Sequence, residues 1–289
     1  MKLFISYFFK TFISAILVLF ILDFIYTKIY VSSKPRNKIS YALQEKNQNF
    51  DVVILGSSRA NNHFESKQFI DMGLHTYNFG MSGASLEESA LLLEILLKEN
   101  TIKNLILEVD LNLQNNYHSE GTRVGFLPYM NQSKIIELYY ANRISNFEIL
   151  NKIPFYRYMK YDSKIGFRES FFTSINKGSE NLKKAGFYGL QGKTNSMRYD
   201  LSNKHPVASY SYEHIKSLCK INNINLIAVT TPMCKNTTGI NFFNEVTTLY
   251  PEIYNLEEVV NNDFYFYSCG HMNEKGAKIY TNYILNKFF

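Results

Sequence analysis

Short apolar strands and helices alternate between residues 51 and 110, and this alternation limits the possible folds more than any other feature of the chain. Asp51 to Leu55 (DVVIL) is an apolar run that ends at a glycine, as expected for a buried parallel strand. Further strands are expected at Thr76 to Phe79 and Asn104 to Val109. Strands that alternate with helices predict an α/β domain of three layers, α/β/α, with a central parallel sheet.

The clearest helix signal lies between the second and third of these strands. Apolar residues recur at helical spacing from Leu86 to Lys98, and Ser85 with Glu88 forms a capping box at the start. The pattern weakens after Asn112, and residues 113–206 are interpreted as an irregular, partly helical insertion over the strand ends. Later elements are expected as helices at 64–72, 133–140, 211–219, 242–249 and 274–289, and strands at 225–231 and 264–266.

A long apolar segment precedes this domain. Residues 3–26 are apolar apart from a few polar positions, and roughly 20 such residues span a bilayer as a helix. Lys10 can reach the interface, whereas Asp23 is costly unless it lies near an interface or faces a partner. A cleaved signal peptide and a buried helix are the alternatives, but no small-residue cleavage site follows. We expect an anchor in the cell membrane at 1–30, a linker at 31–50 and a domain outside the lipid at 51–289.

The net charge of +6 is concentrated around that apolar segment. Residues 1–40 hold six basic side chains against Asp23, a balance of +5, so the rest of the chain is close to neutral. Basic residues that flank an apolar segment are typical of membrane proteins, so the membrane, and not nucleic acid, is the expected partner.

Three cysteines, Cys219, Cys234 and Cys269, are scattered through the second half. Their spacing matches neither a zinc site nor a disulfide framework, and Cys219 reads as a buried apolar filler. Neither GxGxxG nor a P-loop motif occurs, which disfavours nucleotide binding. No metal and no cofactor are expected.

Four blocks of polar residues lie where the strands are expected to end or just before the last helix. They are 56–59 (GSSR), 78–85 (NFGMSGAS), 108–112 (EVDLN) and 268–273 (SCGHMN). Ligands bind at the carboxyl ends of strands in such sheets, so the blocks are expected to meet. Each block alone is as readily a loop or a tight turn.

Taken in order, the four blocks resemble those of the SGNH (GDSL-like) hydrolase superfamily. The resemblance covers residues 50–112 and 210–289, and the phrase His-Met-Asn-x-x-Gly-Ala resembles one found in envelope-associated members. It implies Ser58 as nucleophile, His271 as base, and Gly83 and Asn112 as donors of an oxyanion hole. Ser57 stands at the position of the block's aspartate.

The family's orienting aspartate is replaced by Ser268, and the glycine usual before Asn112 is missing. A serine hydroxyl can accept the Nδ1 proton of a histidine but brings no charge. Three outcomes stay open: a Ser–His dyad, another carboxylate such as Asp263, or loss of activity.

The resemblance implies a serine esterase or O-acyltransferase that acts on acyl esters of cell-envelope polysaccharide. The alternative is a catalytically degenerate SGNH-like domain that binds glycan or supports an envelope assembly. The positive-inside rule, which counts more basic residues after the segment than before it, places the domain in the cytoplasm. The resemblance points outward, and an extracytoplasmic domain is the expectation we adopt.

Overall fold

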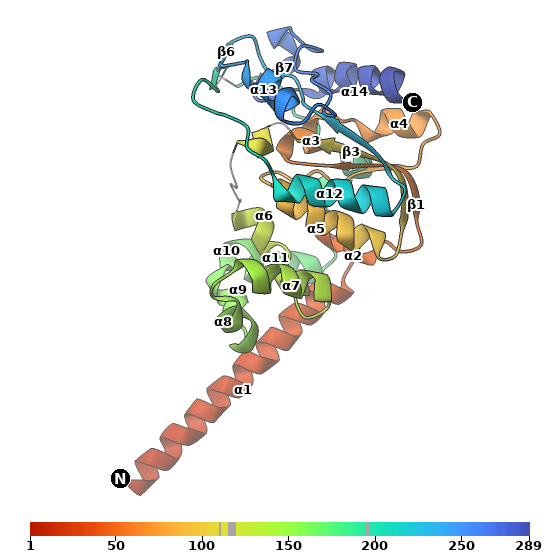
Figure 1. Cartoon of the computed structure of the whole chain (residues 1–289). Helices are drawn as coiled ribbons and strands as arrows, with labels where there is room; N and C mark the ends of the chain where they lie inside the picture. The colour runs from red at the N-terminus through yellow and green to blue at the C-terminus, as the bar shows by residue number, and fades with distance from the viewer. Residues whose placement is uncertain (110, 115–119, 195–196) are drawn as a thin grey trace. The chain divides into compact units, whose positions relative to one another are not determined.

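The computed structural model describes residues 1–109, 111–114, 120–194 and 197–289. They form two compact units (Figure 1). Unit 1 comprises residues 1–40 and 123–178, and unit 2 comprises residues 41–122 and 179–289. The parallel sheet and all four polar blocks belong to unit 2, whereas the long apolar helix belongs to unit 1.

Unit 2 contains a central sheet of four parallel strands in the order β2-β1-β3-β5. The strands are β1 (Asn49–Leu55), β2 (Thr76–Asn78), β3 (Thr101–Glu108) and β5 (Asn225–Val229). Val53 of β1 pairs with Tyr77 on one side and Leu105 on the other. The expected α/β class with a parallel central sheet is confirmed. In open parallel sheets, ligands bind beyond the carboxyl ends of the two strands where the strand order reverses direction. In this sheet, those two strands are β1 and β3.

The strands of this sheet are buried because helices cover them. Val52 to Leu55 expose at most 1% of their surface. The helix α5 (Leu86–Leu97) begins with the expected capping box of Ser85 and Glu88 and packs against α12 (Tyr210–Ile221). The helix α14 (Glu274–Phe288) packs against α3 (Ser58–His63) and α4 (Ser66–Asp71), as Figure 1 shows. Burial of each large apolar side chain contributes roughly 1.5–3 kcal/mol.

The strand expected at 264–266 differs from the observed structure. A 3₁₀ turn, η5 (Asp263–Tyr265), precedes a short hairpin of β7 (Phe266–Ser268) and β8 (His271–Met272), which lies outside the central sheet. The turn forms because the Asn262 side chain accepts a hydrogen bond from the Phe264 N–H. The hairpin places His271 two residues before Asn273, the N-cap of α14.

A disulfide joins Cys234 and Cys269, contrary to the expectation that the cysteines form no disulfide. Cys234 follows the end of β5 and Cys269 lies in the β7–β8 hairpin, so the tertiary fold brings together two cysteines that are 35 positions apart. Cys219 is buried in α12 as expected, and burial raises the pKa of its thiol to about 12.

Unit 1 is helical. Its α1 (Lys2–Ser32) is long and apolar enough to cross a membrane, with a mean hydropathy of 2.2 in its most apolar window, as in a signal anchor or a transmembrane span. Its other elements are η2 (Leu127–Tyr129), α7 (Lys134–Arg143), α8 (Phe147–Lys152), α9 (Tyr156–Lys160), α10 (Asp162–Ile165) and α11 (Phe167–Ser174).

The remaining elements are short connections. They are α2 (Lys38–Gln44), η1 (Leu111–Leu113), α6 (Glu120–Val124), η3 (Glu180–Leu182), η4 (Lys184–Gly186), β4 (Tyr199–Asp200), β6 (Thr237–Thr238) and α13 (Phe242–Leu249).

Candidate active site

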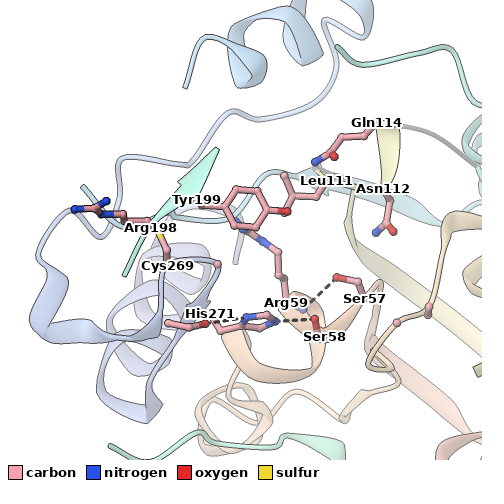
Figure 2. A pocket seen from close by; sticks show the side chains of 14 residues that line it. Ser57, Ser58, Arg59, Leu111, Asn112, Gln114, Arg198, Tyr199, Cys269 and His271 are labelled. Carbon is pink, nitrogen blue, oxygen red and sulfur yellow. Dashed lines mark hydrogen bonds between the residues drawn. The ribbon is translucent and has the colours of Figure 1, made fainter. Parts of the chain in front are cut away.

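Ser58 and His271 point toward each other beyond the carboxyl end of β1 (Figure 2). The Oγ of Ser58 is 2.7 Å from Nε2 of His271, although the two residues are 213 positions apart. The Oγ of Ser268 is 3.2 Å from Nδ1 of the same ring. When the Ser58 hydroxyl donates to Nε2, the ring proton is on Nδ1 and donates to Ser268. In this tautomer Nε2 can take the Ser58 proton.

A sharp turn between β1 and α3 places Ser58 at the pocket. Gly56 has a φ of +138°, and a Cβ at this position would lie 2.9 Å from the Ala60 Cβ and 2.8 Å from a Glu108 carboxylate oxygen. A Cβ at Gly80, after β2, would lie 2.6 Å from the same Ala60 methyl. The turn therefore requires glycine, because no side chain has room where the two strand ends meet α3.

A buried carboxylate, Glu108 at the end of β3, holds this turn in place. Its Oε2 accepts hydrogen bonds from the Ser57 N–H at 2.8 Å and from the Ser57 hydroxyl at 2.7 Å. The Ser57 Oγ in turn accepts from the Arg59 N–H at 3.1 Å, which caps α3. Ser57 thus joins β3 to the first turn of the helix that begins at Ser58. This role of Glu108 was not predicted, although a charge at the end of an apolar strand is a signal that the sequence carries.

The two expected oxyanion donors line the same pocket as Ser58. Gly83 follows β2 and has a φ of +78°, and Asn112 lies in η1 with its Nδ2 3.5 Å from Glu108 Oε1. Asp110, in the same polar block, is outside the described residues. The pocket has a volume of about 470 Å³. Its lining comprises Ser57, Ser58, Arg59, Gly83, Ala84, Leu111, Asn112, Gln114, Arg198, Tyr199, Ser268, Cys269, Gly270 and His271.

The side chain of Arg59 ties α3 to the chain that leaves β5. Its Nε donates to Thr231 Oγ1 at 2.7 Å, and its guanidinium also donates to the carbonyl oxygens of Thr231 and Pro232. The side chain is buried, and the rigid fork of the guanidinium suits several acceptors on one segment. Arg59 therefore fixes the orientation of the helix that carries Ser58.

Asp263, the carboxylate considered as a substitute for the family's aspartate, is engaged elsewhere. Its Oδ1 accepts a hydrogen bond from the Lys235 N–H at 2.9 Å. The Nδ1 position of His271 is instead occupied by Ser268. Ser58, His271 and Ser268 thus lie within hydrogen-bond distance one after another, while Asp263 bonds the Lys235 backbone.

A second histidine, His63 at the end of α3, supports the hairpin from behind. Its ring is buried, its centroid lies 6.2 Å from that of His271, and its Nε2 accepts the Met272 N–H at 3.0 Å. Because Nε2 accepts, the proton of the ring is on Nδ1. Burial, together with the charges of Arg59 and His271, lowers the pKa of His63 well below its ordinary value of 6.5. The ring is therefore neutral in the folded protein.

This neutral histidine makes the stability of the protein depend on pH. Unfolding exposes His63, which then binds a proton below pH 6.5, so its contribution is complete above that pH and is lost as the pH falls. Below pH 6.5, we expect the free energy of unfolding of the wild-type protein to fall by about 1.4 kcal/mol per pH unit relative to that of His63→Gln. Glutamine is chosen because its amide oxygen can still accept the hydrogen bond from the Met272 N–H. Urea titrations between pH 7.5 and pH 5 measure this, and parallel pH curves for the two proteins would contradict it.

Comparisons with known proteins give this site no assigned role. No protein-family model and no curated protein matches the chain. Among solved structures, a gut microbial diltiazem-metabolizing enzyme aligns with 85% of this chain and 48% of its own, at 11% identity and a TM-score of 0.28. The chain thus spans about half the length of that enzyme. These values are too low to support a shared fold or activity.

Proposed function

We propose that the chain is a membrane-anchored serine esterase or O-acyltransferase of the SGNH type, acting on acyl esters of cell-envelope polysaccharide. The proposal depends above all on the 2.7 Å contact between Ser58 Oγ and His271 Nε2 at the rim of a pocket. A hydroxyl within hydrogen-bond reach of a base, with the far nitrogen of that base oriented by a third group, is the arrangement that activates a nucleophile.

In the first half of the reaction, Ser58 Oγ attacks the ester carbonyl while His271 Nε2 takes the hydroxyl proton. The tetrahedral intermediate collapses to an acyl-serine, and the leaving alcohol takes the proton from His271. In the second half, water or a sugar hydroxyl gives its proton to Nε2 and attacks the acyl-serine. The acyl–Oγ bond then breaks, Ser58 Oγ takes the proton back from His271, and the carboxylic acid or the new sugar ester is released. Ser268 Oγ accepts from Nδ1–H throughout and keeps the ring in the productive tautomer.

The negative oxygen of the intermediate needs donors on the pocket side of Ser58. The Ser58 N–H at the start of α3, the Gly83 N–H and the Asn112 amide are assigned to this task. Asn112 is steered by Glu108, because its amide lies 3.5 Å from that carboxylate. Each donor of such a set contributes roughly 10²–10³ in rate in known serine enzymes.

A three-layer SGNH arrangement for unit 2 is part of this proposal. It is supported by the two groups of helices that contact each other, α5 with α12, and α14 with α3 and α4. The apolar cluster that joins β1, β3 and β5 to α14 includes Val52, Ile106, Val229 and Tyr280. A sheet with continuous apolar strands requires cover on both faces.

An extracytoplasmic location of unit 2, with α1 as the membrane anchor, is likewise proposed. The disulfide between Cys234 and Cys269 supports it, because disulfides persist in oxidising compartments and are rare in the cytosol. This observation outweighs the count of basic residues around α1, which favours the opposite orientation.

Labelling with a fluorophosphonate probe tests the proposal. The probe reacts with an activated serine, so wild-type protein is expected to be labelled and Ser58→Ala is expected to lose all labelling. Ser57→Ala removes the adjacent hydroxyl, which faces Glu108 and not His271, and so separates a loosened turn, which slows labelling, from loss of the labelled serine. Labelling that survives in Ser58→Ala would assign the nucleophile to another residue.

A second candidate is a degenerate SGNH-like domain that binds glycan. The uncharged Ser268 in place of a carboxylate favours it, because the imidazolium formed in catalysis then lacks a neighbouring negative charge from this position. In that case folded wild-type protein is not labelled, yet it binds an O-acetylated oligosaccharide in a calorimetric titration, and the binding is weakened by substitutions in the pocket.

A further inference from the structure

Two polar residues of α1 dock onto the helical part of unit 1. The carboxylate of Asp23 accepts hydrogen bonds from the Phe155 N–H at 2.8 Å and from the Arg157 guanidinium at 2.9 Å. One turn later, Thr27 Oγ1 accepts from the same guanidinium at 2.9 Å and lies 2.8 Å from the Tyr158 hydroxyl. Asp23, the costly residue of the apolar segment, is thus satisfied by a partner within unit 1.

The position of this docking fixes where α1 leaves the lipid. Apart from the half-buried Leu19, the apolar side chains from Leu3 to Ile21 are exposed, as are Phe24 and Ile25, while the carboxylate of Asp23 bonds Arg157 of α9. A helical stretch from position 3 to position 21 is about 28 Å long, which matches the hydrocarbon core of about 30 Å. A bilayer whose hydrocarbon holds this stretch would have Asp23 at the depth where the headgroups begin.

The junction of α8 and α9 is held at that same depth. Phe155 bonds Asp23 through its backbone and packs its ring 4.9 Å from Tyr26. Ile153, two residues earlier, exposes 46% of its surface, and Ile149 and Met159 expose 43% and 49%. The side chains of Lys152 and Lys160 between and beside them are exposed as well. An apolar tip flanked by lysines is typical of a surface that enters the interfacial layer of a membrane.

We propose that this tip, residues 149–160, is a second membrane contact, with Ile149, Ile153 and Met159 among the acyl chains and the two lysines against anionic headgroups. It goes beyond the proposed enzymatic function and requires only that α1 is embedded in a bilayer. The continuity of the tip with the lipid-facing part of α1, through the Asp23–Arg157 pair, favours a bilayer over a protein as its occupant. With α1 it gives unit 1 two points of attachment, so the unit cannot rotate freely about the anchor.

Single tryptophans test the proposal, because the natural chain has none. The full-length variants Ile153→Trp, Phe20→Trp and Tyr210→Trp are placed in vesicles of phosphatidylcholine and phosphatidylglycerol, with and without brominated acyl chains. Phe20 is the reference within α1, and Tyr210 of unit 2, which exposes 79% of its surface, is the aqueous reference. We expect Ile153→Trp to emit at shorter wavelength than Tyr210→Trp, to lose intensity to bromine, and to resist aqueous acrylamide.

The outcomes separate the tip from the anchor. If Ile153→Trp behaves like Tyr210→Trp while Phe20→Trp is quenched by bromine, the second contact is overturned and the anchor stands. If Phe20→Trp is not quenched either, both fail. With Lys152→Glu and Lys160→Glu added, bromine quenching of Ile153→Trp is expected to fall in vesicles rich in phosphatidylglycerol. The matched exchange Lys67→Glu in unit 2 is expected to leave it unchanged, and an equal fall with that control would contradict the role of the lysines.

Discussion

Ser58→Ala is expected to lower the rate of hydrolysis of a small activated ester by about 10²–10³-fold. In a complete protease triad, loss of the serine lowers kcat about 2 × 10⁶-fold, and loss of the aspartate alone lowers it about 3 × 10⁴-fold. The ratio of the two, roughly 10², is the rate enhancement expected from serine and histidine without a carboxylate. Ser268 keeps the ring in the correct tautomer and is expected to increase this rate enhancement further. Initial rates at saturating ester measure the effect, and Ser57→Ala again serves as the neighbouring control.

The same assay tests whether Ser58 and His271 act as one unit. His271→Ala is expected to reduce the rate as much as Ser58→Ala, and the double variant is expected to be no slower than either single variant. The 2.7 Å contact is the reason, since Ser58 and His271 act through one shared hydrogen bond and the loss of either residue removes it. Multiplicative losses in the double variant would show that the two residues act independently and would contradict the proposed mechanism.

Removal of the disulfide by Cys234→Ser together with Cys269→Ser is expected to destabilise the protein by about 4 kcal/mol. The bond closes a loop of 35 positions, and the loss of that constraint on the unfolded chain gives this magnitude in the chain-entropy description. Denaturant titrations of wild-type and variant protein without reductant measure the difference. Cys219→Ala, at the buried free cysteine, controls for loss of a thiol as such.

The loss is also expected to reach the active site. Cys269 lies between Ser268 and Gly270 in the hairpin that carries His271, and its carbonyl accepts the Cys234 N–H at 3.0 Å. Fluorophosphonate labelling of the folded variant should therefore slow, because the imidazole is held less firmly. If the variant is destabilised but is labelled at the wild-type rate, the disulfide contributes to stability alone and not to the position of His271.

Features that depend on neighbouring residues in the chain were predictable. The strand–helix alternation predicted the parallel sheet, and the capping box of Ser85 and Glu88 predicted where α5 begins. Both depend on local patterns of burial and hydrogen bonding that are visible in a short window of sequence. The polar blocks at the strand ends likewise pointed to the pocket that they line.

Features that depend on tertiary contacts were not. The pairing of Cys234 with Cys269 follows from where β5 ends relative to a hairpin that periodicity misplaced by two residues. The support that His63 gives to Met272 joins residues 209 positions apart. The link from Glu108 to Ser57 joins the end of β3 to the turn after β1, and although a charge at a strand end is visible in the sequence, no local pattern identifies its partner. Distant pairs of this kind are fixed by the whole fold and leave no signal in a short window.

The crowding around Ala60 has a consequence for tracing the ancestry of this chain. Three positions, 56, 60 and 80, share one space so small that two must lack a side chain and the third can have only a methyl. Selection for a folded nucleophile turn should hold this trio long after the surface has diverged. A search for distant kin is thus better guided by two glycines and an alanine at these intervals than by Ser58 alone.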